Sequence, residues 1–148
     1  MVVNNANLYD FKILNPSWVQ GFTDGEGCFH VSVSKNNATK LGYQVSLEFS
    51  ITQHIRDKEL IEKLIKFFGC GYIINDTSMK VQYRIRDRQE LALYLFPFFD
   101  SNPLLTIKSK DYEDFKLVHS MLAKKLHLTP EGLNEIRLIQ ARMNRNRK

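Results

Sequence analysis

Two stretches of the sequence place an apolar residue at every second position, and this alternation restricts the fold more than any other feature. They cover residues 28–34 and 43–52, where Phe, Val, Tyr, Leu and Ile alternate with His, Ser, Gln and Glu. A period of two is typical of a strand that buries one face and exposes the other. Two further strands are predicted at 71–76 and 80–86, joined by a turn at residues 77–78. The pattern therefore predicts a sheet with one apolar and one polar face.

Helix signals fall before, between and after these strands. Asn15 and Pro16 suit the start of a helix that ends at the glycines preceding the first strand. The order α-β-β-α-β-β-α, with a helical extension, predicts an α+β fold in which helices cover one face of a four-stranded antiparallel sheet. The later helices are predicted at 57–69, at 87–101 with a late disturbance at Pro97, at 111–127, and from Thr129-Pro130 onward.

The chain of 148 residues is expected to form one domain, 1–148. Residues 1–14 are expected to form an N-terminal arm. Residues 129–148 are expected to form a C-terminal helix followed by a basic tail, ARMNRNRK, that frays.

Composition narrows the partners and the compartment. A net charge of +5 and a pI near 9.2 favour an anionic partner such as nucleic acid or a membrane surface. No apolar run approaches the roughly 20 residues of a membrane span, so we expect no span. Cys28 and Cys70 are too few for a disulfide framework, which indicates a reduced, intracellular protein. The first residues lack a secretory or transit pattern, so we expect synthesis in the compartment where the protein works.

The polar face of the predicted sheet carries groups that can read DNA. Hydroxyls, amides and guanidiniums bond to base edges in the major groove, which admits a strand ribbon. A basic fourth strand would supply phosphate contacts. An ordinary solvated face is the alternative, and these residue types alone do not decide between the two. The candidate DNA-binding residues on this face are His30, Ser32, Ser34, Gln44, Ser46, Glu48, Ser50, Lys80, Gln82, Arg84 and Arg86, with Cys28 beside them.

Glycines and acids gather at 19-VQGFTDGEG-27, where the first helix meets the first strand. Gly21 and Gly25 are four positions apart and lie on one helix face, beside Trp18 and Phe22. Residues without side chains let a second backbone approach closely, although glycines near a helix end are also ordinary stop signals. The spacing makes Trp18, Gly21, Phe22 and Gly25 the candidate dimer interface.

Glu26, at the end of this helix, is the candidate metal ligand. If two copies of the helix pack in parallel about a twofold axis, their Glu26 carboxylates come close together. Paired carboxylates suit Mg²⁺, which keeps several of its waters, and a divalent metal can activate water for phosphodiester hydrolysis. Asp24 is interpreted as a structural acid that bonds to backbone.

In these segments the sequence resembles the LAGLIDADG homing endonucleases. The nine-residue family motif corresponds to VQGFTDGEG, with Glu26 in place of a final aspartate. Three further segments are similar to the family: FSITQH, PLLTIKSKDYEDF and LTPEGLNEIRLIQARMN. The resemblance covers nearly the whole chain, and the predicted element order is that of the family fold.

The resemblance implies an enzyme that cleaves both strands of a long double-stranded DNA target, palindromic or nearly so. Because one motif is present, it implies a homodimer, with a saddle-shaped sheet over the major groove. It places Glu26, Gln53 and Lys108 in the catalytic site, with the Gly25 carbonyl as a second metal ligand and Lys110 as a neighbouring DNA contact. The implied cofactor is Mg²⁺ or another divalent cation such as Mn²⁺ or Ca²⁺.

Two other functions stay open on the sequence. One is a non-cleaving nucleic-acid-binding protein, such as an intron RNA maturase or a DNA-binding regulator. The other is a small interaction domain with no nucleic-acid partner. The family is common in organelle and microbial introns, so a mitochondrion or chloroplast is one candidate compartment.

Overall fold

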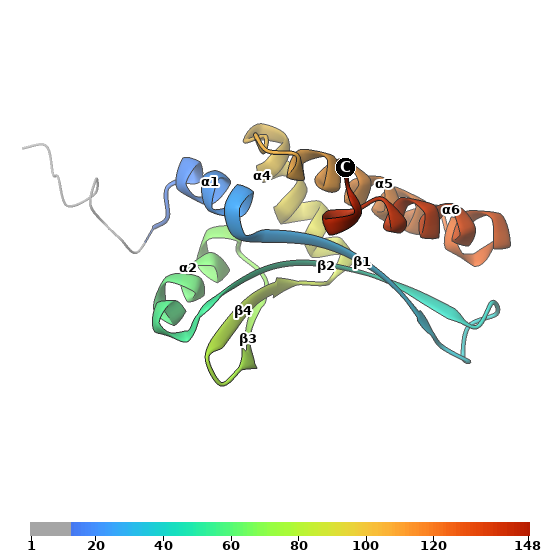
Figure 1. Ribbon diagram of the computed structural model, residues 1–148, viewed down its shortest axis with the longest axis horizontal. Helices are drawn as coiled ribbons and strands as arrows, with labels where there is room; N and C mark the ends of the chain where they lie inside the picture. The colour runs from blue at the N-terminus through green and yellow to red at the C-terminus, as the bar shows by residue number, and fades with distance from the viewer. Residues whose placement is uncertain (1–12) are drawn as a thin grey trace, which may run out of the picture.

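The computed structural model describes residues 13–148, so the arm predicted at 1–14 lies almost entirely outside the described residues. The described chain has the predicted element order, and the α+β class is confirmed. Its main helices and strands, labelled in part in Figure 1, are α1 (Pro16–Glu26), β1 (Gly27–Lys35), β2 (Tyr43–His54), α2 (Lys58–Phe68), β3 (Tyr72–Thr77), β4 (Lys80–Ile85), α3 (Arg88–Glu90), α4 (Phe96–Ser101), α5 (Lys108–Ala123) and α6 (Pro130–Ala141). Short helical turns are η1 (Ile55–Asp57), η2 (Leu91–Leu95), η3 (Leu126–Leu128) and η4 (Asn144–Asn146).

The four strands form one antiparallel sheet in the order β1-β2-β4-β3. β1 pairs with β2 over its whole length, whereas β4 pairs only with the second half of β2, Phe49–His54. Figure 1 shows the helices on one side of an arched sheet, with β1 and β2 continuing as a long hairpin beyond the two shorter strands. Among the described residues, no helix covers the other face.

An aromatic cluster fills the layer between sheet and helices. Phe29, Phe49 and Tyr83 project from the sheet and are fully buried. The ring centroid of Phe29 lies 5.4 Å from that of Phe115 on α5 and 5.9 Å from that of Phe99 on α4. Such aromatic pairs add about 0.5–1.5 kcal/mol beyond the burial of their area. The cluster therefore holds α5 in a fixed position over the strands.

Three predicted helix ends are confirmed by their local geometry. Asn15 Oδ1 accepts from the Ser17 N–H at 2.8 Å at the start of α1, and Thr129 Oγ1 accepts from the Gly132 N–H at 3.0 Å at the start of α6. Gly69 ends α2 with φ +82°, a left-handed conformation that glycine adopts without strain. These signals act within three residues, which is why the sequence alone reveals them.

The predicted turn at 77–78 and the predicted helix at 111–127 have different boundaries in the structure. The β3–β4 turn lies at residues 78–79 rather than 77–78, because a register shift lets β3 continue through Thr77. The helix predicted at 111–127 begins earlier, at Lys108, and ends earlier too. Lys125 has φ +59°, a conformation that an α-helix does not contain, so it separates α5 from η3.

The helix predicted at 87–101 is disturbed before Pro97 rather than at it. η2 is a single stretch of π-helix between α3 and α4. Proline has no N–H, and its ring clashes with the carbonyl four residues earlier, that of Leu93 inside η2. A wider π turn relieves this clash.

In residues 13–148 no helix combines the length and apolar character needed to cross a membrane.

The basic tail is fastened to α5, so the prediction that it frays is wrong. Arg142 Nη2 donates to Asp114 Oδ1 at 2.6 Å, and Arg147 Nε donates to Asp111 Oδ1 at 2.8 Å. Both aspartates are buried, where a charge is stable only if it is paired. Burial raises the pKa of Asp114, but hydrogen bonds from Arg142 and Arg147 outweigh burial and leave that pKa below its usual value.

Candidate active site and nucleic-acid interface

The first helix and the first strand meet without a loop, and this joint exposes Glu26. α1 ends at Glu26 and β1 begins at Gly27. A Cβ on Gly27 would lie 2.6 Å from Thr23 Cγ2 and 2.9 Å from the Thr23 carbonyl oxygen, so the turn has room only for glycine. Thr23 is fully buried, whereas Glu26 is exposed. The carboxylate of Glu26 therefore stands at the end of a rigid helix, outside the core.

A lysine from a distant part of the chain lies beside this joint. Lys108 Nζ donates a hydrogen bond to the Thr23 carbonyl oxygen at 3.0 Å. This carbonyl belongs to the last turn of α1, where the helix dipole favours a cation. Burial lowers the pKa of Lys108, and nearby acidic groups, Glu26 among them, act in the opposite direction. The structure thus brings Lys108 and Glu26 to the same end of α1.

Asp24 fastens the connector before α5 to α1. Its carboxylate accepts hydrogen bonds from the Leu105 N–H at 2.9 Å, the Thr106 N–H at 3.1 Å and the Thr106 hydroxyl at 2.7 Å. Burial raises the pKa of Asp24, but these bonds outweigh burial and lower it. The prediction that Asp24 bonds to backbone is confirmed. The same bonds hold Lys108, two residues after Thr106, against α1.

Gln53 lies near the end of β2, opposite Val81. β1 begins opposite Ile51, so Gln53 lies beyond the β1–β2 pairing. It is half-buried, and its alternation with Ile51 places it on the helix-covered face. Among the described residues its amide makes no hydrogen bond to Glu26 or Lys108. Its catalytic role stays a prediction.

The outward face of α1 has an open notch at its glycines, on the same helix as two stacked aromatic rings. Trp18 and Phe22 stack with centroids 4.6 Å apart and planes 16° apart. Gly21 and Gly25 are exposed, and a Cβ on either would meet nothing within 4 Å. The helix continues through both glycines to Glu26, so they are not stop signals. No close contact within the described chain requires glycine at these two positions.

The pairing register places the predicted DNA-binding residues of three strands on one face. Cys28, Ser50 and Arg84 lie opposite one another across β1, β2 and β4. Arg84 Nε is 3.3 Å and Arg86 Nε 3.6 Å from the carboxylate of Glu48, so charges on this face are partly paired, and Ser50 is buried among them. By the same alternation the uncovered face also carries His30, Ser32, Ser34, Gln44, Ser46, Lys80 and Gln82.

Lys110 is the one predicted DNA contact that lies on a helix. It belongs to the first turn of α5, is exposed, and its Nζ is 3.4 Å from a carboxylate oxygen of Glu113. Its role stays a prediction.

Sequence reasoning missed part of the uncovered face. Gln82 Nε2 donates to Thr52 Oγ1 at 2.8 Å, and Ile74 lies opposite Gln82 on β3. Tyr72 lies opposite Arg84 in the same way. β3 shows no alternation of its own, so only its register with β4 could have found Tyr72 and Ile74, whereas Thr52 and His54 continue the alternation of β2. The residues added to the face are Thr52, His54, Tyr72 and Ile74.

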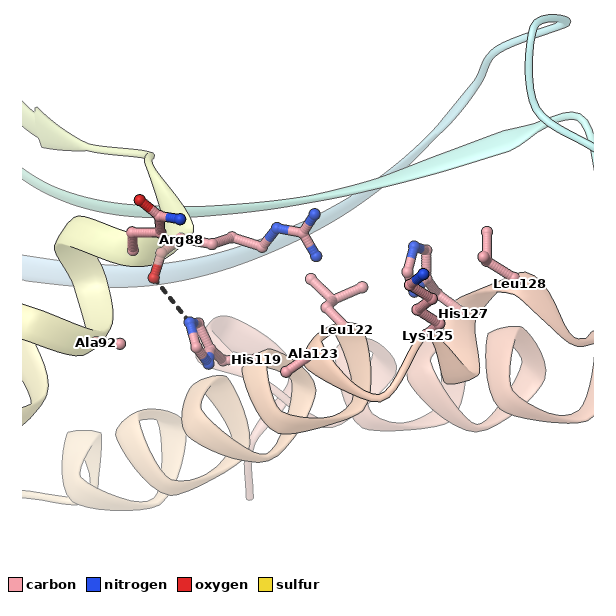
Figure 2. Close-up of a pocket in the computed structure, with 9 residues that line it drawn as sticks. Arg88, Ala92, His119, Leu122, Ala123, Lys125, His127 and Leu128 are labelled. Carbon is pink, nitrogen blue, oxygen red and sulfur yellow. Dashed lines mark hydrogen bonds between the residues drawn. The ribbon is translucent and has the colours of Figure 1, made fainter.

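A pocket of about 510 Å³ lies away from this site, between α3 and the C-terminal end of α5 (Figure 2). His119 Nε2 lies 2.8 Å from the Arg88 carbonyl oxygen there, and His127 lines the same pocket. His54 caps η1 by accepting from the Arg56 N–H at 3.1 Å.

The residues at the joint fit a hard divalent cation. Within residues 13–148, no three His, Cys, Asp or Glu side chains group closely enough to hold a metal by themselves. Mg²⁺ commonly uses one or two carboxylates together with waters and substrate phosphates. The exposed Glu26 carboxylate next to Gly25 supplies oxygen ligands of that kind.

Known proteins are similar to this chain in both sequence and fold. Probable intron-encoded endonuclease 3 of Neurospora crassa is 37% identical over 142 residues, which cover 95% of this chain and 26% of that protein. The solved homing endonuclease I-TnaI is 45% identical, with a TM-score of 0.85 and 88% of both chains covered. I-SmaMI, solved on an uncleaved DNA target in the presence of calcium ions, is 38% identical with a TM-score of 0.85, covering 88% of this chain and 45% of that chain. The chain spans about a quarter of the first curated relatives it matches.

The family model described as LAGLIDADG endonuclease matches residues 19–119. The match starts inside α1, takes in all four strands, and ends inside α5 beyond Lys108. It therefore includes the joint at Glu26 and most of the chain. The chain belongs to the LAGLIDADG endonuclease family.

Proposed function

We propose that this chain is a site-specific homing endonuclease that cleaves both strands of a long, palindromic or pseudo-palindromic DNA target. The observation that supports this most is the placement of the Lys108 amine beside the exposed Glu26 at one end of α1. Phosphodiester hydrolysis uses a metal-binding carboxylate and a fixed cation that holds charge on the phosphate. β1 starts directly after Glu26, so the candidate site adjoins the polar face proposed to bind DNA.

Each residue of the site has its own role in this proposal. Glu26 and the Gly25 carbonyl bind a divalent cation, Mg²⁺, Mn²⁺ or Ca²⁺. When bound, such a cation supplies an activated water and stabilises negative charge on the phosphate. The Lys108 amine holds charge on the scissile phosphate or lowers the pKa of the attacking water. Gln53 orients solvent from the end of β2.

We further propose that two copies of the chain pair through α1. The notch at Gly21 and Gly25 would accept the backbone of the second helix, flanked by Trp18 and Phe22. A twofold axis at this seam brings two Glu26 carboxylates to one stretch of duplex. It also makes the two half-sites of the target mirror the symmetry of the protein.

Selection of cleaved sites from a randomised duplex library, with Mg²⁺ and with an EDTA control, tests the proposal. Recovery of one pseudo-palindromic sequence only with Mg²⁺ is the expected result. Specific DNA binding without cutting would favour a DNA-binding regulator, and specific RNA binding an intron maturase. Retention of no nucleic acid would favour the small interaction domain.

Replacing Lys108 by alanine should slow single-turnover cleavage by roughly 10²–10³-fold, the range for losing one preorganised charge-stabilising group. Binding of the target should weaken much less, because Lys108 is half-buried beside α1. Lys124→Ala is the matched control, since it removes an exposed lysine from the far end of the same helix, α5. If Lys108→Ala loses cleavage and binding to the same extent, Lys108 contributes to DNA binding and not to catalysis.

Replacing Arg84 by alanine should weaken target binding by about 1–3 kcal/mol and relax preference at one base pair in each half-site. Arg84 lies on the uncovered face, held in place by Glu48 at 3.3 Å. Binding to the target and to its single-base variants measures both effects, with Lys58→Ala on α2 as the charge-matched control. A loss that is uniform across sequences would instead mark a phosphate contact.

We propose that the protein is encoded in an organelle intron and works in that organelle. The name of the Neurospora crassa relative, a probable intron-encoded endonuclease, supports the intron origin. Cell fractionation followed by immunoblotting tests the organelle location.

A further inference from the structure

A buried carboxylate lies one helical turn from the candidate catalytic lysine. Asp111 follows Lys108 by three positions on α5, a spacing at which side chains meet on the helix surface. The carboxylates whose charges act on the Lys108 amine are Asp24 and Glu26 on α1, and Asp111 itself. Asp24 is already bonded to Leu105 and Thr106. Asp111 is therefore the buried acid best placed to compete with Thr23 for the amine.

The C-terminal segment occupies this competing carboxylate. Asp111 Oδ1 accepts from Arg147 Nε at 2.8 Å and from the Asn144 N–H at 3.0 Å. Asp111 is 5% exposed, so water replaces these partners poorly. Arg147 also donates to one carboxylate oxygen of Asp114, and the other oxygen accepts from Arg142 Nη2 at 2.6 Å. The four groups form one charge-balanced cluster.

The same segment is attached to the strand that begins after Glu26. Gln140 Nε2 donates to the Val31 carbonyl at 2.9 Å, and Asn144 Nδ2 donates to the Phe29 carbonyl at 3.0 Å. Both carbonyls lie along β1, an outer strand of the sheet. Residues 140–147 thus connect β1, which carries the Glu26 joint, to α5, which carries Lys108.

We propose that Arg147 is a positioning residue for the cleavage reaction: it occupies Asp111 and so leaves the Lys108 amine on the Thr23 carbonyl beside Glu26. The proposal rests on the proposed role of Lys108. Without Arg147, Asp111 would be a buried carboxylate with no paired cation, and Lys108 lies one helical turn away on the same helix. The amine would leave the end of α1 to pair with it.

Arg147→Ala should slow single-turnover cleavage roughly 10- to 100-fold, the scale on which a small misplacement of a catalytic group acts. Target affinity should change less than threefold, because Arg147 is bonded within the protein. Asp111→Asn added to Arg147→Ala should restore most of the lost rate, because the amide keeps the oxygen that accepts from Asn144 and no longer attracts the amine. Lys124→Ala, which removes one charge from the end of α5, is the control for charge alone.

The double variant tests whether Arg147 acts through the charge of Asp111, and a double variant as slow as Arg147→Ala overturns the proposal. Because Asp111→Asn would also relieve a tail that Arg147 only braces, the position of the Lys108 amine separates positioning from bracing. If Arg147→Ala does not fold, Arg147→Gln with and without Asp111→Asn gives the same comparison.

Crystal structures of these variants test the proposal without any cleavage. Lys108 Nζ is expected within ion-pair distance of Asp111 in the single variant and on the Thr23 carbonyl in the double variant. An amine that stays on Thr23 in Arg147→Ala overturns the inference even if the wild type cuts. If the Lys108 amine moves to Asp111 as expected but the wild-type protein does not cleave DNA, the proposed function is wrong and the control of the Lys108 position by Arg147 still holds.

Discussion

Replacing Glu26 by glutamine should abolish DNA cleavage while leaving specific binding largely intact. Glutamine keeps the size of the side chain but removes the negative charge that a hard divalent cation requires. Loss of metal-assisted charge stabilisation amounts to several kcal/mol, so the single-turnover rate should fall by at least about 10³-fold. Glu26 is exposed at the end of α1, and no ion pair of the described chain uses its carboxylate, so folding should be unaffected.

Two controls make this result specific. Glu113→Gln removes an equally exposed carboxylate from α5 and should cut at the wild-type rate. Glu26→Asp retains a metal ligand on a shorter side chain and should keep part of the activity. Cleavage by Glu26→Gln at more than a tenth of the wild-type rate would remove Glu26 from the metal site.

The parts of the fold that could be predicted depend on signals acting over a few residues. The alternation at 43–52 assigns each side chain to a face because successive residues of a strand point in opposite directions. The caps at Asn15 and Thr129 bond to an N–H two or three residues away. For the same reason the sequence alone predicts the junction of helix and strand at Glu26.

The parts that could not be predicted depend on distant segments meeting. Lys108 reaches Thr23 across 85 positions, and only a family resemblance, not a spacing, singled it out. Arg147 reaches Asp111 across 36 positions. Nothing local in ARMNRNRK distinguishes a solvated basic run from one whose arginines neutralise buried carboxylates, so the tail was wrongly expected to fray. Sheet order also determines which residues of β3 share the uncovered face, and β3 carries no pattern of its own.

Replacing Gly21 or Gly25 by leucine should leave the subunit folded but prevent it from pairing and cutting. Within the described chain, a Cβ at either position meets nothing within 4 Å, so the subunit has room for the new side chain. Removing a helical glycine even favours α1, by up to about 1 kcal/mol. The melting temperature of the isolated subunit should therefore not fall.

The cost of the leucine appears only when a second helix approaches. Overpacking costs about 1–3 kcal/mol at each copy, and a twofold axis doubles it. The dissociation constant of the dimer should rise by roughly 10²-fold or more, measured by analytical ultracentrifugation. Cleavage should be lost at concentrations where the wild type is dimeric, while one half-site is still bound.

Two other substitutions separate this effect from its alternatives. Lys66→Leu adds an equally exposed leucine to α2 and should leave both association and cleavage unchanged. Gly27→Ala places a methyl group 2.6 Å from Thr23 Cγ2, so it should destabilise the subunit itself. If Gly21→Leu remains dimeric and cuts normally, α1 is not the seam. The two Glu26 carboxylates would then have to reach the duplex by a different arrangement of subunits.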